Sequence, residues 1–274
     1  MAEPAVSYFS GVNLRYGDVR ALDQVSFDLR PGETIVIFGE AGSGKTMLVK
    51  TAAGLVKPDA GRVWLFGQEM TRLRERALYS IRSQVGILFQ EGGLFDSLTI
   101  AENVAYPLLN QYAAHKDDKV LPPEEVDQRV RESLTFVELE HTLDKFPSEL
   151  SGGMRRRAGI ARAIVTAPQL VLYDSPTAGL DPITANLIIN LILKGRDMRN
   201  TATIMVTHRY QDGHLMANFR YNPSSEKIER AESSQLTTRF FVMQEGRLFF
   251  EGSEAELRAS TDSYVQKFAR PGSS

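Results

Sequence analysis

The chain carries a complete phosphate-binding loop, which reads Gly39-Glu40-Ala41-Gly42-Ser43-Gly44-Lys45-Thr46. It fits the pattern G-x-x-x-x-G-K-[ST], whose backbone N–H groups cradle phosphates while the lysine reaches the terminal phosphates and the last hydroxyl ligates Mg²⁺. An apolar run at 34–38 precedes the loop and a helical run at 47–53 follows it. This is the strand, loop and helix order that the motif needs. We therefore predict that the chain binds a nucleoside triphosphate together with Mg²⁺.

Length and composition limit the alternatives. A chain of 274 residues suits one large domain or two small ones. The formal net charge is −2 and the pI about 6.1, so no basic field favours a nucleic-acid partner. No apolar run reaches the roughly 18 residues of a membrane span, and residues 1–11 lack a signal-peptide pattern. We expect a cytosolic protein without a spanning segment; with no cysteine, it forms no disulfide or thiolate metal site.

The first ninety residues predict a strand-rich piece joined to the start of an α/β core. The expected strands cover residues 6–14, 25–29, 34–38, 61–67 and 85–89. From about 94 to 166 the apolar residues fall at helical spacing, which predicts a helical insert. Within it, the polar segment 113–125 contains Pro122-Pro123 and is expected to be a loop between helices.

After the insert the α/β pattern returns. We expect a strand at 170–173, a helix at 183–199 that begins at Asp181-Pro182, and a strand at 203–207. The polar composition of 222–235 predicts a mobile loop, and 240–250 predicts a hairpin around Glu245-Gly246. Ser253 and Glu256 form a capping box that opens a last helix. Its expected buried positions are Leu257, Tyr264, Val265 and Phe268.

Further polar residues stand where a nucleotide site would use them. Ser151, Gly152 and Gly153 open a helix, and exposed amides with a hydroxyl at a helix start face phosphate well. Asp174 ends an apolar strand, as a carboxylate on the Mg²⁺ side of such a site does. Asp181 follows in a Gly-Leu-Asp turn, and His208 stands at the end of the next strand. None of these residues is specific alone, but their order along one chain is.

Taken together, these residues resemble the nucleotide-binding domain of ABC transporters, from Tyr16 to about Gly252. The resemblance implies an α/β fold: a P-loop NTPase (RecA-like) core with an antiparallel β subdomain and an inserted α-helical subdomain. The whole chain, 1–274, would form a single such domain. Its expected parts are 1–93 (β subdomain and the phosphate-loop part of the core), 94–166 (helical subdomain), 167–212 (rest of the core), 213–239 (polar insertion) and 240–274 (hairpin and C-terminal helix).

The resemblance also implies a role for each matching residue. The ligand is ATP with Mg²⁺, Tyr16 stacks on the adenine, and Gln90 senses Mg²⁺ and the γ-phosphate. Ser151, Gly152 and Gly153 form the signature motif, Asp181 belongs to the D-loop, and His208 is the switch histidine. The expected metal ligands are Thr46, Gln90 and Asp174, and the expected catalytic positions are His208, Gln90 and Ser175. Because such domains pair head to tail, each ATP would lie between one phosphate loop and the signature motif of a second copy.

A narrower likeness concerns residues 90–108. This stretch is similar to the Q-loop region of ATPase subunits that serve Mce/Mla-type lipid transporters. That group implies integral-membrane permease subunits, a possible Mce-domain partner, and a peripheral position on the cytoplasmic side of the inner membrane. The transported substrate would be phospholipid or another lipid.

One position departs from the family pattern. Asp174 is followed by Ser175, where the family has the glutamate that polarises the attacking water. A serine hydroxyl cannot accept that proton, and a positioned base is worth about 10²- to 10⁴-fold in rate. Three interpretations stay open: a slow ATPase that relies on phosphate positioning and His208, an ATP-gated clamp that barely hydrolyses, or another carboxylate such as Glu91 in the missing role.

Other classes of function remain as alternatives. A nucleotide-dependent regulatory module without turnover is the main rival to a transport ATPase. A soluble ABC-type ATPase of nucleic-acid metabolism is disfavoured by the near-neutral charge and the lack of zinc-binding cysteines. The segment 222–235 exceeds the usual family connection; we expect a surface loop or a partner-contacting element there.

Overall fold

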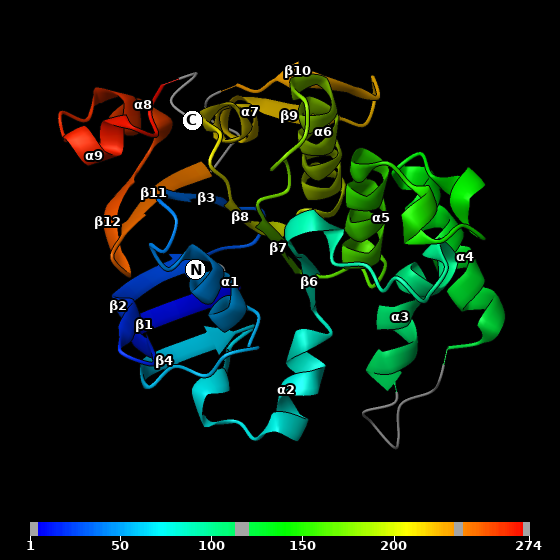
Figure 1. The fold of residues 1–274 in the computed structure, drawn as a ribbon, viewed down its shortest axis with the longest axis horizontal. Coiled ribbons are helices and arrows are strands. Elements are labelled where there is room, and N and C mark those ends of the chain that lie inside the picture. Colours follow the sequence, from blue (N-terminus) through cyan, green and yellow to red (C-terminus); the bar gives the residue numbers. More distant parts are fainter. Residues whose placement is uncertain (1–4, 113–120, 233–237, 271–274) are drawn as a thin grey trace.

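The computed structural model describes residues 5–112, 121–232 and 238–270. In this part of the chain the larger sheet has the strand order β12-β11-β3-β8-β7-β6 (Figure 1). Neighbouring strands are parallel except for the β11–β12 hairpin. The strands are β3 (Thr34–Gly39), β6 (Val85–Leu88), β7 (Leu170–Asp174), β8 (Ala202–Val206), β11 (Thr238–Gln244) and β12 (Arg247–Gly252).

One face of this sheet is covered by helices. Strand residues alternate between the two faces, so Val36 and Phe38 of β3 point to this side while Ile35 and Ile37 point to the other. The helices that share this first core are α3 (Ile100–Tyr112), α4 (Pro123–Phe136), α5 (Gly152–Ile164), α6 (Pro182–Arg199), α7 (Tyr210–Asn218), α8 (Glu254–Ala259) and α9 (Ser263–Gln266).

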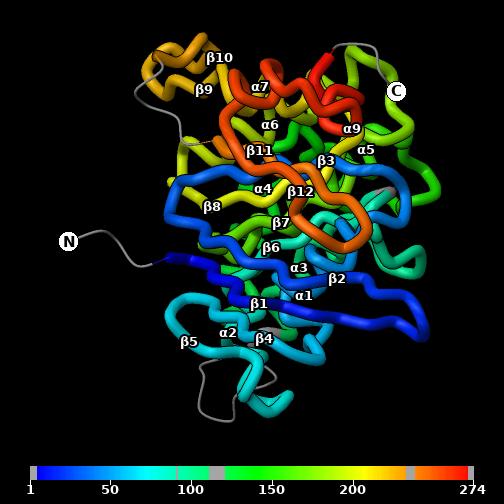
Figure 2. Tube along the Cα trace, turned by 90° about the vertical axis from the view of Figure 1, so that its left-hand side faces the viewer, coloured from blue at the N-terminus to red at the C-terminus, as the bar shows by residue number. Residues whose placement is uncertain are grey.

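The opposite face packs against a second, antiparallel sheet with the order β2-β1-β4-β5. Figure 2 shows this layering, with β1 and β4 below the larger sheet and α6 and α7 above it. The elements on this side are β1 (Ser7–Tyr16), β2 (Val19–Leu29), β4 (Ala60–Leu65), β5 (Gln68–Glu69), α1 (Lys45–Ala52) and α2 (Glu75–Arg82).

Short connections complete the described chain. Single turns of 3-10 helix lie at η1 (Met70–Arg72), η2 (Gln90–Gly92), η3 (Glu140–Thr142) and η4 (Pro147–Glu149). No helix in residues 5–112, 121–232 and 238–270 is long and apolar enough to cross a membrane.

The register of the parallel strands brings the ends of β3, β8 and β7 to one line. Ile37 pairs with Val206, and Val206 pairs in turn with Asp174. Parallel strands share the direction of their carboxyl ends, so the loops that follow all three strands leave the same edge of the sheet. The nucleotide motifs of the sequence lie on these loops.

The prediction of a mobile loop over 222–235 is wrong in its first part. The chain forms a hairpin of β9 (Phe219–Asn222) and β10 (Lys227–Arg230), and residues 233–235 lie outside the described residues. The hairpin is anchored to α6 because Asp197 accepts a hydrogen bond from the Tyr221 backbone N–H at 2.6 Å. The ammonium of Lys194 also lies 5.5 Å from the Tyr221 ring centre. These contacts with α6 stabilise the hairpin, although its second strand lies within a segment whose polar composition alone favours a loop.

Smaller differences concern helix ends. The loop expected over 113–125 ends earlier, because α4 begins at Pro123, the first helical position that proline favours; residues 113–120 lie outside the described residues. The last helix is two helices, since Ser260 turns the chain out of α8 and Asp262 caps α9. Leu257 and Val265 are buried as expected, whereas Tyr264 and Phe268 are only partly buried. Helix α2 was not predicted.

Candidate functional site

The phosphate loop follows β3 and leads into α1. Gly44 has φ 103°, and a Cβ there would lie 2.3 Å from the carbonyl oxygen of Ala21. Only glycine allows this backbone conformation and close approach, which let the chain curl before α1 begins at Lys45. Leu48 and Val49 are buried and fix α1 between the two sheets. The open amino end of α1 therefore points its unpaired backbone N–H groups into the loop.

Lys45 is buried and folded back on its own loop. Its ammonium donates hydrogen bonds to the carbonyl oxygens of Gly39 and Glu40, both at 2.7 Å, and to the Ser43 hydroxyl at 3.1 Å. Burial lowers the pKa of Lys45 to about 8, although the negative charges of Asp174 and Glu40 act against that shift. The site thus holds a positive charge that lacks full solvation and gains from an anionic ligand.

Asp174 stands at the end of β7 beside the start of α1. The Thr46 hydroxyl donates to one carboxylate oxygen of Asp174 at 3.2 Å, and the Ser175 hydroxyl donates to the other at 3.2 Å. A hydroxyl and a carboxylate at this separation offer the oxygen ligands that Mg²⁺ prefers, with the remaining positions left for phosphate and water. The chemistry of this pair fits Mg²⁺.

These groups line one cavity of about 750 Å³. The structure also places Tyr16, Gln90 and His208, to which the family resemblance assigns roles at the nucleotide, on the wall of this cavity. Burial and the charge of Lys45 lower the pKa of His208, while Asp174 opposes the shift. The described residues that line the cavity are Tyr16, Val19, Ala21, Ala41, Gly42, Ser43, Gly44, Lys45, Thr46, Met47, Lys50, Val56, Gln90, Asp174, Ser175, Ala178, Val206 and His208.

The structure does not bring the signature residues to this cavity. Ser151, Gly152, Gly153 and Asp181 line a separate pocket of about 430 Å³. The Ser151 hydroxyl caps α5 by accepting from the Met154 N–H at 3.3 Å. Asp181 caps α6, and the donors from Thr184 and Ile183 hold its carboxyl pKa below the usual range. One chain therefore presents two half-sites that face different volumes.

The sequence reasoning missed some residues around the site. Val19 lines the cavity next to Tyr16 because the two residues face each other across the β1–β2 turn. Asp212 is fully buried and accepts hydrogen bonds from the hydroxyls of Thr177 at 2.5 Å and Thr207 at 2.6 Å. It thereby joins the segment after Ser175 to the strand end before His208. The hairpin spacing would have indicated Val19, whereas no sequence signal indicates Asp212.

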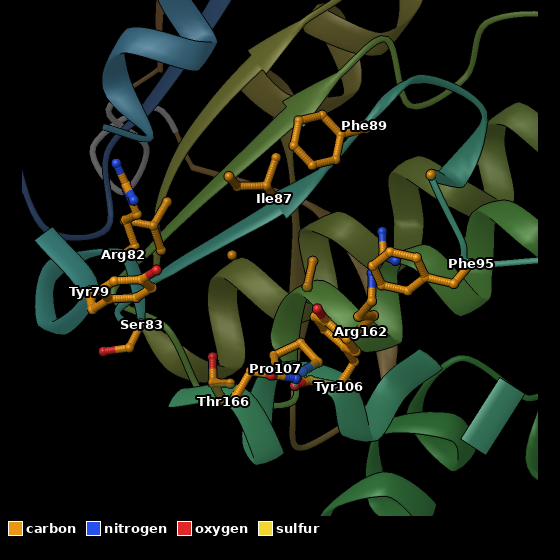
Figure 3. Close-up of a pocket in the computed structure, with 15 residues that line it drawn as sticks. Tyr79, Arg82, Ser83, Ile87, Phe89, Phe95, Tyr106, Pro107, Arg162 and Thr166 are labelled. Atoms are coloured by element: carbon orange, nitrogen blue, oxygen red, sulfur yellow. Dashed lines mark hydrogen bonds between the residues drawn. The ribbon is translucent and has the colours of Figure 1, made fainter. Parts of the chain in front are cut away.

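A second concave feature lies between α2, β6, α3 and α5. This groove has a volume of about 500 Å³ and a mainly apolar lining that includes Tyr79, Phe95 and Tyr106 (Figure 3). The guanidinium of Arg162 lies 5.7 Å from the Phe95 ring centre and donates to the carbonyl oxygen of Gly92 at 3.0 Å. Arg162 thus links the groove to the Gln90–Gly92 turn, which reaches the cavity wall.

Comparisons with known proteins agree with this geometry. A profile described as ABC transporter matches residues 22–178. The intermembrane phospholipid transport system ATP-binding protein MlaF of Haemophilus influenzae is 34% identical over 217 residues, covering 79% of this chain and 80% of that protein. The methionine import ATP-binding protein MetN of Carboxydothermus hydrogenoformans is 39% identical over 191 residues, or 69% of this chain. The matched region spans about half, 54%, of that MetN.

Among solved structures, the ATP-binding cassette MJ0796 in a dimeric post-hydrolysis state bound to ADP and Pi has a TM-score of 0.74. It is 27% identical, and the match covers 90% of this chain and 98% of that one. The predicted fold class, an α/β nucleotide-binding core with an antiparallel β sheet and inserted helices, is confirmed by this likeness.

The lowered pKa of Lys45 predicts how ATP affinity depends on pH. Below pH 8 the ammonium is charged in both free and bound protein, so affinity should be flat. Above pH 8 the free protein loses the proton and binding must take it up again, so the Kd should rise by up to about tenfold per pH unit. Calorimetric titration between pH 7.5 and 9.5 measures this rise. Lys45→Arg, which stays charged throughout, should give a flat profile; a flat wild-type profile would contradict the prediction.

Proposed function

This chain belongs to the ABC transporter family as an ATP-binding subunit, and we propose that it couples ATP to the transport of a lipid through separate permease subunits. The assignment of ATP as the ligand rests on one observation: Lys45, Thr46 and Asp174 line the same cavity. The assignment of a lipid as the substrate rests on the similarity to MlaF, whose alignment covers 79% of this chain and 80% of that protein.

We propose the following binding mode for ATP. The triphosphate lies against the loop amides and the amino end of α1, and the Lys45 ammonium exchanges loop carbonyl oxygens for phosphate oxygens. Tyr16, exposed at the cavity mouth, offers its ring to the adenine. Thr46 and Asp174 would hold Mg²⁺, and Gln90 reaches the same wall. The metal supplies charge neutralisation at the phosphates.

In the described part of the chain, the site lacks the usual catalytic base for ATP hydrolysis. Ser175 stands where a base should be, and its hydroxyl is engaged with Asp174. Among the described residues that line the cavity, Asp174 is the one carboxylate, and it is committed to Thr46 and the metal. The side chain of Glu91 lies outside the described residues. Positioning and charge stabilisation by the loop, Lys45 and His208 remain, so we propose slow hydrolysis, with an ATP-gated clamp as the second candidate.

The two half-sites support a proposed pairing of two copies. The signature pocket carries an open helix start at Ser151–Gly153 but no phosphate loop, and the cavity carries the loop but no signature. A head-to-tail dimer would bring the two together around one ATP. The dimeric MJ0796 cassette supports this arrangement. A homodimer would carry Ser175 in both sites.

The groove of Figure 3 is the proposed docking site of the permease. Tyr79, Phe95 and Tyr106 are large, exposed side chains that line a concave surface, which marks a protein-binding site. Through Arg162 and Gly92, the groove connects with the turn that holds Gln90. A permease segment bound there would therefore sense whether the cavity is filled. An Mce-domain protein is a further proposed partner of the complex, and the chain would lie peripherally on the cytoplasmic side of the inner membrane.

A first prediction concerns Ser175. If this position limits turnover, Ser175→Glu should raise phosphate release by about 10²-fold or more, because it restores a carboxylate base. The Kd for ATP should stay within about twofold, since the loop and Asp174 are unchanged. Phosphate release from the assembled complex and calorimetry of the subunit measure the two effects. A robust wild-type rate that the variant does not exceed would show that Ser175 is not the critical position.

A second prediction concerns the groove. Tyr106 is 42% exposed and packs on Phe95 at 4.7 Å between ring centres. Tyr106→Asp should abolish co-purification with the permease because a charge cannot be buried unpaired in an apolar contact. ATP binding by the subunit should be unchanged. Tyr8, 43% exposed on β1, provides the matched control, and Tyr8→Asp should leave assembly intact. Equal loss in both variants would contradict the docking site.

A third prediction tests the substrate class. The complex reconstituted in proteoliposomes should transfer a fluorescent phospholipid in an ATP-dependent way and should not move radiolabelled methionine. The Lys45→Ala complex, which lacks the phosphate-binding ammonium, sets the background. ATP-dependent methionine uptake without lipid transfer would overturn the lipid assignment and favour the substrate named for the MetN relative.

A further inference from the structure

The C-terminal helix α9 lies against the phosphate loop, although the two are more than 200 residues apart in the sequence. The hydroxyl of Tyr264 accepts a hydrogen bond from the backbone N–H of Glu40 at 3.2 Å and donates one to the carbonyl oxygen of Met243 at 2.9 Å. It therefore bridges the second residue of the loop and the end of β11. Figure 1 shows α9, in red, beside the orange strands β11 and β12.

Packing fixes the position of this hydroxyl. Phe268 stacks on Phe38, the β3 residue just before the loop, with ring centres 6.0 Å apart. The Tyr264 ring meets Phe268 edge-on at 5.4 Å and Phe249 edge-on at 5.9 Å. Asp262 caps α9 and Val265 is buried. The ring is thus held by apolar neighbours on several sides, and its hydroxyl presents a fixed partner to the loop.

The peptide units around Glu40 are held from two sides. The N–H of Glu40 donates to Tyr264, and its carbonyl oxygen accepts from the Lys45 ammonium at 2.7 Å. When phosphate arrives, Lys45 has to turn toward it and weaken its bonds to the carbonyl oxygens of Gly39 and Glu40. Tyr264 then still holds the Glu40 N–H, beside the bond of the Ser43 N–H to the Glu40 carbonyl oxygen at 3.2 Å and the pairing of Gly39 with Met243.

We propose that Tyr264 is a positioning residue for ATP, which keeps the phosphate loop in its binding shape while Lys45 changes partners. The inference rests on the proposed ATP-binding role of the loop and assigns a further determinant of its affinity. It acts through Glu40 and does not touch the nucleotide. A loop that is already ordered loses less conformational entropy when the ligand binds, so the tie favours binding.

Lys267 adds a weaker contact from the same helix. Its ammonium lies 2.6 Å from a carboxylate oxygen of Glu40 and 5.2 Å from the centre of the Tyr264 ring. Both side chains of the pair are 55% exposed, so solvent screens their attraction. The hydrogen bond from the Glu40 N–H differs from this pair because its acceptor, the Tyr264 hydroxyl, sits on a ring that is fixed by packing against Phe249 and Phe268.

The test removes the hydroxyl and keeps the ring. Tyr264→Phe should raise the Kd for Mg-ATP by about three- to tenfold, the range expected for one lost hydrogen bond. Hydrogen exchange of the peptide that contains residues 39–44 should become faster in the free protein. Lys267→Gln should change the Kd by less than about twofold because its pair is screened.

Tyr210→Phe is the matched control. The Tyr210 hydroxyl donates to Glu254 of the neighbouring helix α8, so this variant also frees a C-terminal helix but no phosphate-loop atom. It should leave both the Kd and the exchange of 39–44 unchanged. An unchanged or lower Kd in Tyr264→Phe, with or without a loss of thermal stability, would overturn the positioning role. Failure of the wild-type chain to bind ATP would instead contradict the proposed function itself.

Discussion

The alignment of three parallel strands is the constraint on which the site depends. Because Ile37, Val206 and Asp174 share one register line, the loops after β3, β8 and β7 leave the sheet side by side. That geometry places the Lys45 ammonium, the Asp174 carboxylate and the His208 ring around one cavity although they are far apart in sequence. The backbone hydrogen bonds of the sheet thus fix the charge pattern of the site before any ligand binds.

The elements that could be predicted from the sequence are those whose local residue pattern matches the position that they take in the fold. The phosphate loop needs glycine at fixed places, so its strand, turn and helix could be predicted from residues 34–53 alone. The hairpin of β9 and β10 was missed because its strands are short and half-buried at most, and because β10 lies within a segment of polar composition. Its order comes from Asp197 on α6, a contact that no local pattern of the hairpin encodes. Tertiary packing overrode composition there.

Some features of the site could not be predicted from a local sequence pattern. Tyr16, Gln90 and His208 could be placed only through their order along the chain, since each alone has many ordinary uses. The bond between Tyr264 and Glu40 spans 224 positions, and sequence separation of that size carries no periodic signal. The apolar groove is likewise made by elements that meet only in space. Sequence pattern predicts elements, and the fold decides which surfaces they build.

Hydrogen bonds with α5 and α7 hold the loops around the nucleotide cavity, and α5 also lines the apolar groove. Arg162 of α5 donates to the carbonyl oxygen of Gly92, and Arg156, six residues earlier on the same helix, donates to the carbonyl oxygen of Ala178 at 3.0 Å. Asp212 ties Thr177 to Thr207 on the other side. These bonds fix the turn with Gln90, the segment after Ser175 and the strand end before His208 to rigid elements. In the proposed function, a ligand that moves one of these segments must move or break its tie, so a change at the phosphates would reach the groove through α5 even if Ser175 makes cleavage slow. On that proposal, the free energy of ATP binding would drive the coupling between cavity and groove, and hydrolysis would return the protein to its starting state.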